Sequence, residues 1–508
     1  MKRIKILSFI LTLVLVCSAL TACGASGPAS AKKDTLTVGT ASDSKSLDPA
    51  IAVDVHSSTV YSQIYETLLA LDTKKNLIPK LAEYKQLDDL NYEFYIKQGV
   101  KFHNGEELKA SDVVFTIKRG IETPLLQYIF DVVDPASVVA KDDYTVALKL
   151  ASPSASFLSS LTSNSASVVS EKAVSEGGEN YGMNPVGTGP MKFVKWEKNV
   201  SIEIERNDDY YGQKPELKKI IFKPIIEATN RTIELETGGI DVAVDIPPTD
   251  YTRVAENADL RLATETGYSI RYVGFNLSKP PFDNEKVRQA ISHAIDAEGI
   301  TLSIRSKNEE VTNAPYSSAM MFYDRNIEHA TYDPALAKQL LAEAGYPKGF
   351  TTTIIADERK ERVDIATIVQ QQLAEIGVTA DIKVMEWGTF LNATYGGDTE
   401  LYVMGWSSAI PDPDYVVYSV FHSSMMGEGG NMSFVNDPRV DALVERGRTT
   451  SNFDERGQIY SELQALLKEL SPWVYLWTET LFVGVSDSID YIELHPSAVY
   501  PFYKVTFK

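Results

Sequence analysis

The sequence predicts a mixed α/β protein of two or three domains. Runs in which apolar and polar residues alternate predict strands, and runs with apolar residues at i, i+3, i+4 and i+7 predict helices. In the later half of the chain the two kinds of run follow one another, which is typical of a βαβ-like lobe. A length of 508 residues is enough for two or three domains, each with its own core.

The N-terminal segment has the pattern of a secretory signal peptide. Basic residues at positions 2, 3 and 5 precede an apolar run from residue 6 to residue 20, and small residues follow. This run is too short to favour a permanent membrane span. The four residues that end at Cys23, Leu-Thr-Ala-Cys, resemble the lipobox of bacterial lipoproteins, which implies a signal peptide over residues 1–22 and lipid on Cys23. The alternative is an ordinary signal peptide in which this cysteine is incidental.

The segment after the expected cleavage point reads as a flexible tether. Residues 23–34 are mostly small residues and lysine, a composition typical of flexible linkers. The chain has two cysteines, Cys17 inside the signal segment and Cys23 at its end. The mature fold is therefore expected to contain no disulfide, no thiolate metal site and no thiol nucleophile. Lipid on Cys23 would hold the protein on the outer face of the cell membrane.

The formal net charge of −20 limits the partners of this protein. An acidic surface repels phosphate groups, so nucleic acid is not an expected partner. The same acidity fits a domain that is held near an anionic membrane without lying on it. The sequence also contains 26 tyrosines, a residue type that serves both binding clefts and ordinary cores.

Alternating apolar and polar residues place the expected strands along the chain. A hairpin is expected around Asn199, because a strand-like run precedes it and another follows it. The expected strands cover residues 36–40, 91–97, 144–150, 192–196, 201–206, 379–385 and 473–485. Residues 152–170 are rich in serine and small residues, and this segment is expected to be a loop.

Helices are expected where apolar residues recur at helical spacing behind a capping residue. Ser111 and Asp283 are the expected N-caps of two helices, and Asp333 with the following proline begins a third that ends at Gly345. The expected helices cover a segment through Val60, Ile64 and Leu68 and residues 111–119, 287–295, 334–344, 363–375, 437–446 and 453–470.

The segment LYVMGWSSAIPDPDYVVYSVF, residues 401–421, is the expected centre of a ligand site. A strand begins at Leu401 and stops near Gly405 and Trp406, because two prolines follow and proline prevents regular strand pairing. A large aromatic residue, a glycine and the carboxylates of Asp412 and Asp414 therefore meet at a strand end, where open α/β folds place ligands. The alternative is a turn with two surface acids and a core tryptophan.

The sequence offers no recognisable catalytic set. The motifs of zinc proteases, serine hydrolases, nucleotide-binding P-loops and dithiol oxidoreductases are all missing. The six histidines are dispersed, and no two are spaced as metal ligands on one helix face. Asp412 and Asp414 are too few to hold a hard cation, which needs six to eight oxygens. We therefore expect a protein that is not an enzyme and that has no cofactor and no metal.

Several motifs spread over most of the chain resemble one family. The matching segments are residues 46–49 (SLDP), 81–83 (LAE), 92–105, 110–119, 184–196 (NPVGTGPMKFVKW), 275–276 (FN), 281–283 (PFD), 287–291 (VRQAI) and 405–413. Together they are similar to the extracellular solute-binding proteins of family 5, which are the peptide, glutathione and nickel receptors of ABC importers. The lipobox was identified independently and agrees with this resemblance.

The resemblance implies a two-lobe, periplasmic-binding-protein-like clamshell of class II with an extra inserted subdomain. The chain is expected to cross between the lobes near Phe275 and again near Thr480. The implied parts are lobe I (residues 35–66, 188–275 and 481–508), the inserted subdomain (residues 67–187) and lobe II (residues 276–480). Closure of such a clamshell buries a polar ligand between the lobes.

The resemblance also implies a function. The protein is expected to be a lipid-anchored, monomeric receptor that captures a peptide or peptide-like solute and delivers it to an ABC permease and its ATPase. Tethering through Cys23 would raise its concentration near that permease. Two alternatives remain open: a receptor for a non-peptide solute such as a sugar or metal complex, and a signalling receptor for a peptide pheromone.

Candidate ligand residues follow from the resemblance one by one. The segment Val53, Asp54 and Val55 corresponds to backbone and side chains that the family offers to the ligand. Trp387 corresponds to an aromatic residue that lines the cleft. The segment Gly405, Trp406 and Ser407 corresponds to the one that pairs with a peptide backbone as an added strand would.

Arg271 is a further candidate on physical grounds, independent of the resemblance. It lies between Tyr268 and Tyr272 near the expected crossing, where its guanidinium could bind a carboxylate through two hydrogen bonds. The alternative for Arg271 is an inter-lobe or surface salt bridge.

Ala409 departs from the family pattern. Peptide receptors of the family usually carry Asp three residues after the tryptophan of Gly-Trp, and its carboxylate neutralises the α-ammonium of the ligand. A buried ammonium without a carboxylate costs several kcal/mol. Either Asp412 or Asp414 supplies the charge, or the ligand has no amine at that point, as in glutathione with its γ-linkage or in a non-peptide solute.

Overall fold

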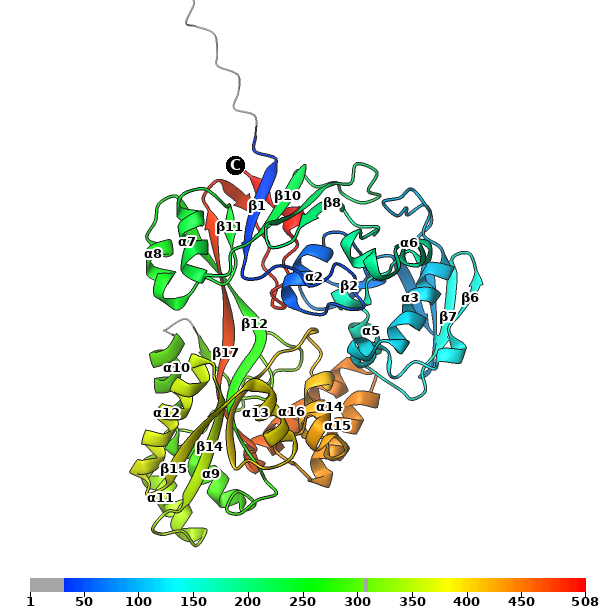
Figure 1. The fold of residues 1–508 in the computed structure, drawn as a ribbon. Helices are drawn as coiled ribbons and strands as arrows, with labels where there is room; N and C mark the ends of the chain where they lie inside the picture. The colour runs from blue at the N-terminus through cyan, green and yellow to red at the C-terminus, as the bar shows by residue number, and fades with distance from the viewer. Residues whose placement is uncertain (1–31, 306–308) are drawn as a thin grey trace, which may run out of the picture.

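Two long antiparallel strands join the two lobes of this protein. The computed structural model describes residues 32–305 and 309–508. The joining strands, β12 (Leu260–Phe275) and β17 (Trp473–Ser486), pair from one end to the other. Figure 1 shows them passing from the upper lobe, lobe I, where the described chain begins and ends, to the lower lobe, lobe II. Their register slips near Thr266 and Ile270, where the pair passes between the lobes.

A single 11-stranded sheet runs through both lobes because β12 and β17 belong to both. Its order is β15-β14-β16-β12-β17-β11-β1-β10-β9-β8, and β13 pairs with β17 off this path. The other strands are β1 (Thr35–Thr40), β8 (Met191–Glu197), β9 (Ser201–Arg206), β10 (Lys219–Pro224), β11 (Val242–Ala243), β13 (Glu310–Val311), β14 (Thr351–Asp357), β15 (Thr379–Met385) and β16 (Leu401–Trp406).

Lobe I combines the first and last parts of the chain in one core. Leu36 and Val38 of β1 pack in the same buried cluster as Phe222 of β10, Val485 of β17 and Phe507 near the C-terminus. The remaining elements of this lobe are α2 (Val55–Tyr61), α7 (Ala228–Glu236), α8 (Tyr251–Ala255), β18 (Ile489–Tyr491) and β19 (Thr506–Phe507), and α6 (Glu171–Gly177) of the preceding segment packs against its core through Ala173. The fold of lobe I therefore depends on the final segment of the chain.

Lobe II has a core on each face of its part of the sheet. Leu401 and Val403 of β16 belong to one buried cluster, whereas Tyr402 and Met404 belong to another, as strand alternation requires. The helices of this lobe are α9 (Glu285–Ala294), α10 (Ala297–Arg305), α11 (Pro334–Glu343), α12 (Lys360–Glu375), α13 (Trp387–Tyr395), α14 (Asp414–Phe421), α15 (Pro438–Thr449) and α16 (Phe453–Leu470).

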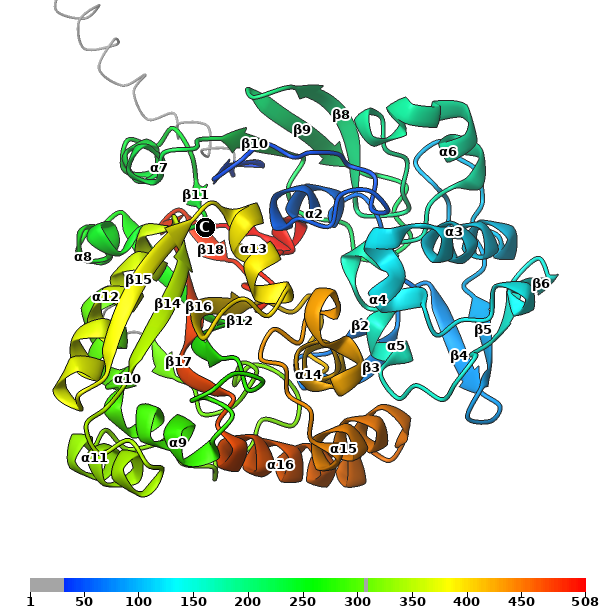
Figure 2. The same ribbon diagram turned by 60° about the horizontal axis from the view of Figure 1, so that its bottom comes forward.

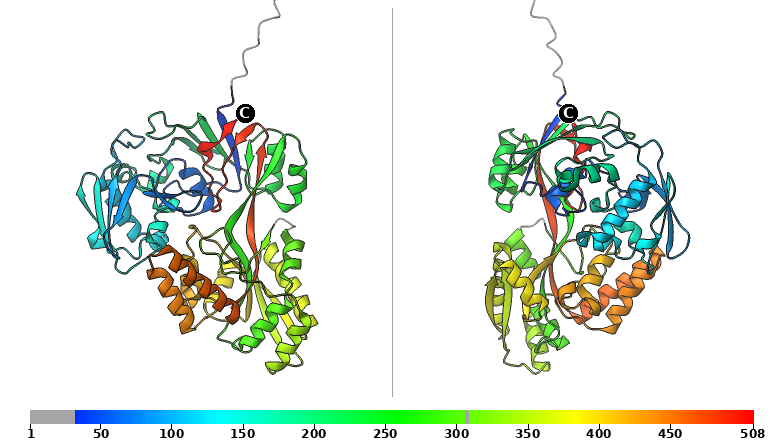
Figure 3. Two further views of the ribbon diagram at one scale, coloured as in Figure 1. Left: turned by 180° about the vertical axis from the view of Figure 1, so that it is seen from behind. Right: turned by 45° about the vertical axis from the view of Figure 1, so that its right-hand side comes forward.

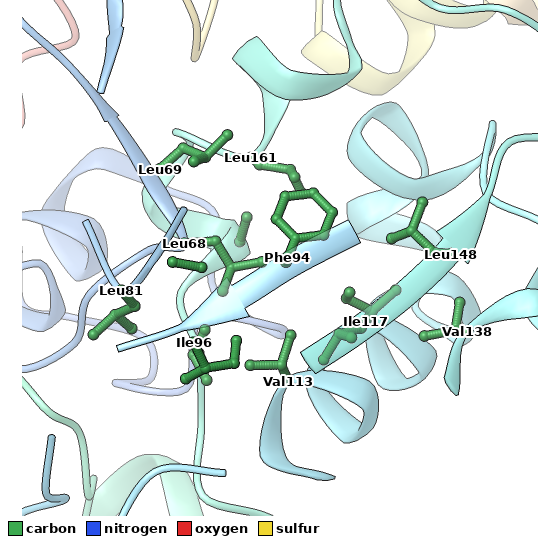
Figure 4. Packing of buried hydrophobic residues seen from close by; sticks show 14 of the residues in the cluster. Leu68, Leu69, Leu81, Phe94, Ile96, Val113, Ile117, Val138, Leu148 and Leu161 are labelled. Carbon is green, nitrogen blue, oxygen red and sulfur yellow. The ribbon is translucent and has the colours of Figure 1, made fainter. Parts of the chain in front are cut away.

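A smaller subdomain with its own sheet is attached to lobe I. Its four strands lie in the order β4-β5-β7-β6, and Figure 4 shows Phe94 of β5 and Ile117 of α3 within its apolar core. Its elements are β2 (Leu69–Leu71), β3 (Leu77–Pro79), β4 (Ala82–Gln86), β5 (Asn91–Ile96), β6 (Val139–Asp142), β7 (Thr145–Lys149), α3 (Ala110–Glu122), α4 (Gln127–Phe130) and α5 (Phe157–Ser160). The two-lobe α/β clamshell with an additional subdomain is therefore confirmed.

Most of the expected elements are present near their expected bounds. The hairpin β8–β9 turns at Asn199, which has a φ of 59°. Asp333 caps α11 by accepting hydrogen bonds from two backbone N–H groups, and Gly345 follows the helix with a φ of 93°. The expected signal peptide and Cys23 lie outside the described residues. Within the described part, no helix is both long enough and apolar enough to cross a bilayer.

Four details of the expected elements are wrong. The helix expected through Leu68 ends at Tyr61, because the next carbonyls, of Gln63 and Ile64, accept hydrogen bonds from Met191 and Gly189. Residues 152–170, which were expected to be a loop, include the short helix α5.

The expected N-caps of α3 and α9 are each displaced. Lys109 occupies the cap position of α3, where Asp112 reaches back to accept its backbone N–H at 3.0 Å. Asn284, not Asp283, caps α9 through a hydrogen bond from the backbone of Lys286. The carboxylate of Asp112 and the side-chain amide of Asn284 therefore make the hydrogen bonds that were expected of Ser111 and Asp283.

Candidate functional site

The end of β16 presents an open backbone edge near the point where β12 and β17 pass between the lobes. On one side, Gly405 and Trp406 pair with Arg271 and Ile270 of β12. On the other side, β14 pairs with β16 only at Leu401 and Tyr402, so in the described chain the ladder stops before Gly405. An extended ligand could therefore add to this edge as a further strand.

Trp406 contributes an indole donor that has no partner among the described residues. Its ring lies 5.9 Å from that of Tyr415 at a tilted angle, which holds the side chain against α14. The indole N–H is buried and receives no acceptor in this structure. A buried donor without an acceptor costs about 1–3 kcal/mol, so a ligand oxygen placed there would be favoured.

Arg271 is held by carboxylates of the protein itself. Its Nε atom lies 2.8 Å from Glu361 of α12, and its Nη2 atom lies 3.6 Å from Glu479 of β17. Arg305 also binds Glu361, at 3.3 Å. This arrangement corresponds to the salt-bridge alternative for Arg271, and it joins the crossing strands to the helices of lobe II.

Trp387 lies at the first turn of α13, and the residue is 36% exposed. The guanidinium groups of Arg359 and Arg362 lie 4.7 and 5.3 Å from its ring centre. Both arginines also bind Asp357 at the end of β14, at 3.1 and 3.0 Å. The tryptophan is thus an exposed aromatic surface with a fixed orientation.

The lobe I candidates stand at the start of α2. Val53 and Val55 are 40% and 43% exposed, which leaves two apolar side chains in contact with solvent. Asp54 is the N-cap of α2, where it accepts hydrogen bonds from the backbone N–H and the hydroxyl of Ser57. Figures 1 and 2 show α2 on the lobe I side and α13 on the lobe II side of the space between the lobes.

A cavity of about 370 Å³ lies between the lobes, and we call it the cleft cavity. Ala409 and Pro411 of lobe II face it, opposite Ser62 and Tyr65 after α2. The subdomain contributes Thr162, Ser163, Asn164 and Ser167, and the C-terminal segment contributes Glu493, His495, Ser497 and Val499. Of the candidate ligand residues, Ala409 is the one that lines this cavity.

The charged groups of the cleft cavity are neutralised by one another. Glu66 binds Lys80 at 3.0 Å, and Glu493 binds Lys504 at 2.8 Å. Burial lowers the pKa of His495 below its usual value, and its Nδ1 atom lies 2.7 Å from the hydroxyl of Ser497. The cavity therefore offers mainly hydroxyl groups and a neutral imidazole to a ligand.

Asp412 points into lobe II and away from the cleft cavity. Its carboxylate is 0% exposed and accepts two hydrogen bonds from Arg456, at 2.6 and 2.8 Å. The arrangement is a buried, bidentate ion pair, so the carboxylate is already neutralised. In this conformation Asp412 does not supply the charge that Ala409 lacks.

A second contact joins the subdomain to lobe II, and we call it the latch. Ser156 beside α5 donates a hydrogen bond of 2.7 Å to Asp414, and the backbone of Ala155 donates one of 2.6 Å to Arg448. Tyr128 and Tyr415 meet with their ring centres 5.3 Å apart. Figure 3 shows α5 near α14 and α15, away from the β12–β17 pair. The lobes are thus connected on two sides of the cleft.

Sequence reasoning missed the parts of the site that come from the subdomain and the C-terminal segment. Eight serines from residue 154 to residue 170 are buried, including Ser163 and Ser167 at the cleft cavity. A serine-rich run inside a large domain was the available signal, but it was interpreted only as a loop. Among the described residues, no group of three or more His, Cys, Asp or Glu is placed to hold a metal ion.

Two lobes joined by two strands around a polar cavity define a solute-binding protein of the clamshell type. The chain belongs to the bacterial extracellular solute-binding proteins, family 5, whose model matches residues 76–428. It is 30% identical over 501 residues to the glutathione-binding protein GsiB of Pectobacterium atrosepticum, covering 96% of this chain and 97% of the relative. It is also 30% identical to the oligopeptide-binding protein AppA of Bacillus subtilis, covering 98% and 97% of the two chains.

A solved structure has the same fold. The periplasmic binding protein DppA of Helicobacter pylori, in complex with the peptide STSA, superposes with a TM-score of 0.77 at 28% identity. The match covers 93% of this chain and 98% of that chain. These relatives are binding proteins by name, in agreement with the lack of a catalytic motif in the sequence.

Proposed function

We propose that the protein captures a peptide or peptide-like solute between its lobes and delivers it to the permease and ATPase of an ABC importer. The observation that carries this proposal is the open backbone edge of β16 at Gly405 and Trp406, followed within three residues by Ala409 at the cleft cavity. An extended peptide binds such an edge through main-chain hydrogen bonds. The glutathione- and oligopeptide-binding relatives support the same class of solute.

The proposed contacts on lobe II come from two places. The backbone of Gly405, Trp406 and Ser407 pairs with the solute, and the indole N–H of Trp406 donates to one of its carbonyls. Trp387 offers its exposed ring to an apolar part of the solute. Asp412 has a structural role in this proposal, because it is already paired with Arg456.

The proposed contacts on lobe I come from Val53, Asp54 and Val55, which approach the solute from the opposite side when the lobes close. Arg271 keeps its ion pairs with Glu361 and Glu479, so we assign it to the crossing between the lobes. A ligand carboxylate would have to displace two protein carboxylates to reach this guanidinium.

Ala409 restricts the chemical class of the proposed solute. The carboxylates around the cleft cavity, Glu66 and Glu493, are paired with lysines. A free α-ammonium beside Ala409 would lose its water without gaining a charged partner. The proposed solute therefore carries no free α-amine at that point, as in a peptide whose amine is displaced by a γ-linkage.

The proposal includes the N-terminal segment and the division of the chain. Residues 1–22 are removed, lipid on Cys23 anchors the monomer to the outer face of the membrane, and residues 23–34 form the tether. The proposed bounds are lobe I at 35–66, 188–275 and 481–508, the subdomain at 67–187 and lobe II at 276–480. The protein binds and releases its solute without chemical change.

Native mass spectrometry of the protein purified without denaturation tests the proposed solute. Bound masses that fit short peptides or a thiol tripeptide are expected, because a closed clamshell retains its ligand. Trp406→Ala is expected to lose most of the bound ligand, whereas Tyr95→Ala, which changes an exposed tyrosine of the subdomain sheet, should keep it. Sugars or metal complexes as the bound species would contradict the proposal.

Gene deletion separates import from signalling. Loss of peptide uptake in the deletion strain is the expected result for an importer receptor. Unchanged uptake together with an altered response to peptides would instead favour a pheromone receptor.

A further inference from the structure

A second cavity, of about 550 Å³, lies where lobe I meets the subdomain, and we call it the outer cavity. Three segments form it, residues 79–97, 210–216 and 491–506, and none of its lining residues belongs to lobe II. Its rim includes Glu216, which binds Lys32 at the start of the described chain at 2.7 Å. The outer cavity therefore lies near the point where the described chain begins.

Tyrosine rings form much of the wall of the outer cavity. Tyr210 and Tyr211 lie with their ring centres 4.9 Å apart, and both hydroxyls donate to the buried carboxylate of Glu66, at 2.7 and 3.1 Å. Because the hydroxyls are engaged inside the protein, these two side chains offer their ring surfaces to the cavity. Tyr491 and Tyr503 add two more rings.

Four lysines line the same cavity, and two of them are already neutralised. Lys80 binds Glu66 at 3.0 Å and Lys504 binds Glu493 at 2.8 Å.

Lys97 and Lys214 are different. Neither forms an ion pair with any residue that the structure describes, and Lys97 lies over the ring of Tyr211 at 4.9 Å. Two uncompensated cations in one cavity are unexpected in a protein with a net charge of −20.

We propose that the outer cavity is a second ligand site, for a small anion that carries a flat ring. The ring lies against the tyrosines, and the phosphate or carboxylate lies between Lys97 and Lys214. Ring stacking and charge are separate contributions, and the cavity supplies both. The site is distinct from the cleft cavity, although Lys80, Tyr503 and Lys504 line both.

The lining of the outer cavity comes from lobe I and the attached subdomain, and no residue of lobe II belongs to it. We therefore expect the cavity to bind its ligand without closure of lobe II over a solute. The proposal does not depend on the identity of that solute.

Titration calorimetry of the purified protein with phenyl phosphate, inorganic phosphate and phenol tests the site. We expect phenyl phosphate to bind at least about tenfold more tightly than either fragment, which is about 1.4 kcal/mol. The affinity should fall with increasing salt, because charge supplies part of it. Lys97→Met and Lys214→Met should each weaken phenyl phosphate by about tenfold.

Lys118→Met is the matched control, because Lys118 is an exposed lysine of α3 that does not line the outer cavity. It should bind phenyl phosphate like the wild type. The melting temperature of every variant verifies that it is folded. We expect Lys97→Met and Lys214→Met to fold normally, because both lysines are exposed.

Three results would overturn the proposal. They are no binding of phenyl phosphate up to about 10 mM, wild-type affinity in both lysine variants, and equal affinity for phenyl phosphate and one fragment. Equal affinity for phenyl phosphate and inorganic phosphate would show that the ring adds nothing to binding. Equal affinity for phenyl phosphate and phenol would show that the anion adds nothing.

Discussion

The side chain of Arg271 lies directly across the backbone of Gly405. A Cβ atom at Gly405 would stand 2.8 Å from Nη1 and 2.9 Å from Cδ of Arg271, and 2.7 Å from the carbonyl oxygen of Ile270. A glycine is therefore needed where β16 meets the crossing strand β12. The open edge and the ion pairs of Arg271 with Glu361 and Glu479 depend on this close approach.

Gly405→Ala is expected to lower the free energy of unfolding by about 1–3 kcal/mol, because Arg271 or the strand must move. Solute affinity should fall as well, since the same backbone forms the edge. Urea denaturation and calorimetry measure the two effects. Gly388→Ala is the control, because its new methyl group would meet only the flexible carboxylate of Glu386, at 3.1 Å. Equal stability of both variants would contradict the close approach.

Asp412→Asn is expected to destabilise the protein by about 3–5 kcal/mol, because it leaves the buried guanidinium of Arg456 without a charged partner. Asp208→Asn provides the comparison: Asp208 binds Arg206 at 2.8 Å but is 72% exposed, so a loss of about 0–1 kcal/mol is expected. Denaturant unfolding of both variants checks this difference. A stable Asp412→Asn protein with weakened solute binding would instead return Asp412 to the ligand site.

Ala409→Asp should increase the affinity for a dipeptide with a free amine by about tenfold, because a carboxylate would then face the ammonium in the cleft cavity. Calorimetry with the dipeptide and with its N-acetylated form measures this effect. The acetylated form serves as the control, because it has no charge to neutralise. A gain of the same size for both ligands would show that the ammonium does not lie beside residue 409.

Ser156→Ala is expected to favour separated lobes in the ligand-free protein. It removes the 2.7 Å hydrogen bond to Asp414. Burial raises the pKa of Asp414, so its charged form is stabilised by the few groups that contact it. The loss is about 1–3 kcal/mol. X-ray scattering should show a larger radius of gyration than for Ser175→Ala, which changes an exposed serine of α6. Superimposable curves for the two variants would exclude the latch.

His103 should make stability depend on pH. Burial lowers its pKa to about 4, and its Nε2 atom lies 2.9 Å from the carbonyl of Gly189. The unfolded chain, with a histidine pKa near 6.5, binds the proton more readily than the folded protein. The contribution of His103 is therefore complete above about pH 6.5 and is lost as the pH falls toward about 4, by roughly 3 kcal/mol.

Urea denaturation of the wild type and His103→Gln at about pH 7 and about pH 4.5 measures the difference in this loss. Glutamine can keep the hydrogen bond to Gly189 but does not titrate. An equal loss in both proteins would assign the pH dependence to other groups.

The elements that could be predicted are those whose determinants lie next to one another in the sequence. β17 was predicted from one long apolar run, and the β8–β9 hairpin from two alternating runs around Asn199. The caps of α3 and α9 were misplaced by one or two residues, because Ser111 and Asp283 are good capping types beside the positions that the backbone uses.

The site could be predicted only in part, because its contacts join distant segments. Trp406 and Ala409 follow from one motif, but the partner of Asp412 is 44 residues away and that of Ser156 is 258 residues away. The partner of Arg271 is 90 residues away. Arg271 was predicted from its neighbours to bind either a ligand carboxylate or a protein carboxylate, whereas the carboxylates that bind it could be identified only from the fold.

The central place of β17 in the sheet determines when the protein can fold during synthesis. Its sheet neighbours β11 and β12 end at residues 243 and 275, yet β17 begins at residue 473. Pairing across such a sequence separation is slow. A ribosome must therefore release nearly the whole chain before the middle of the sheet can form, and until then the new chain remains accessible to chaperones.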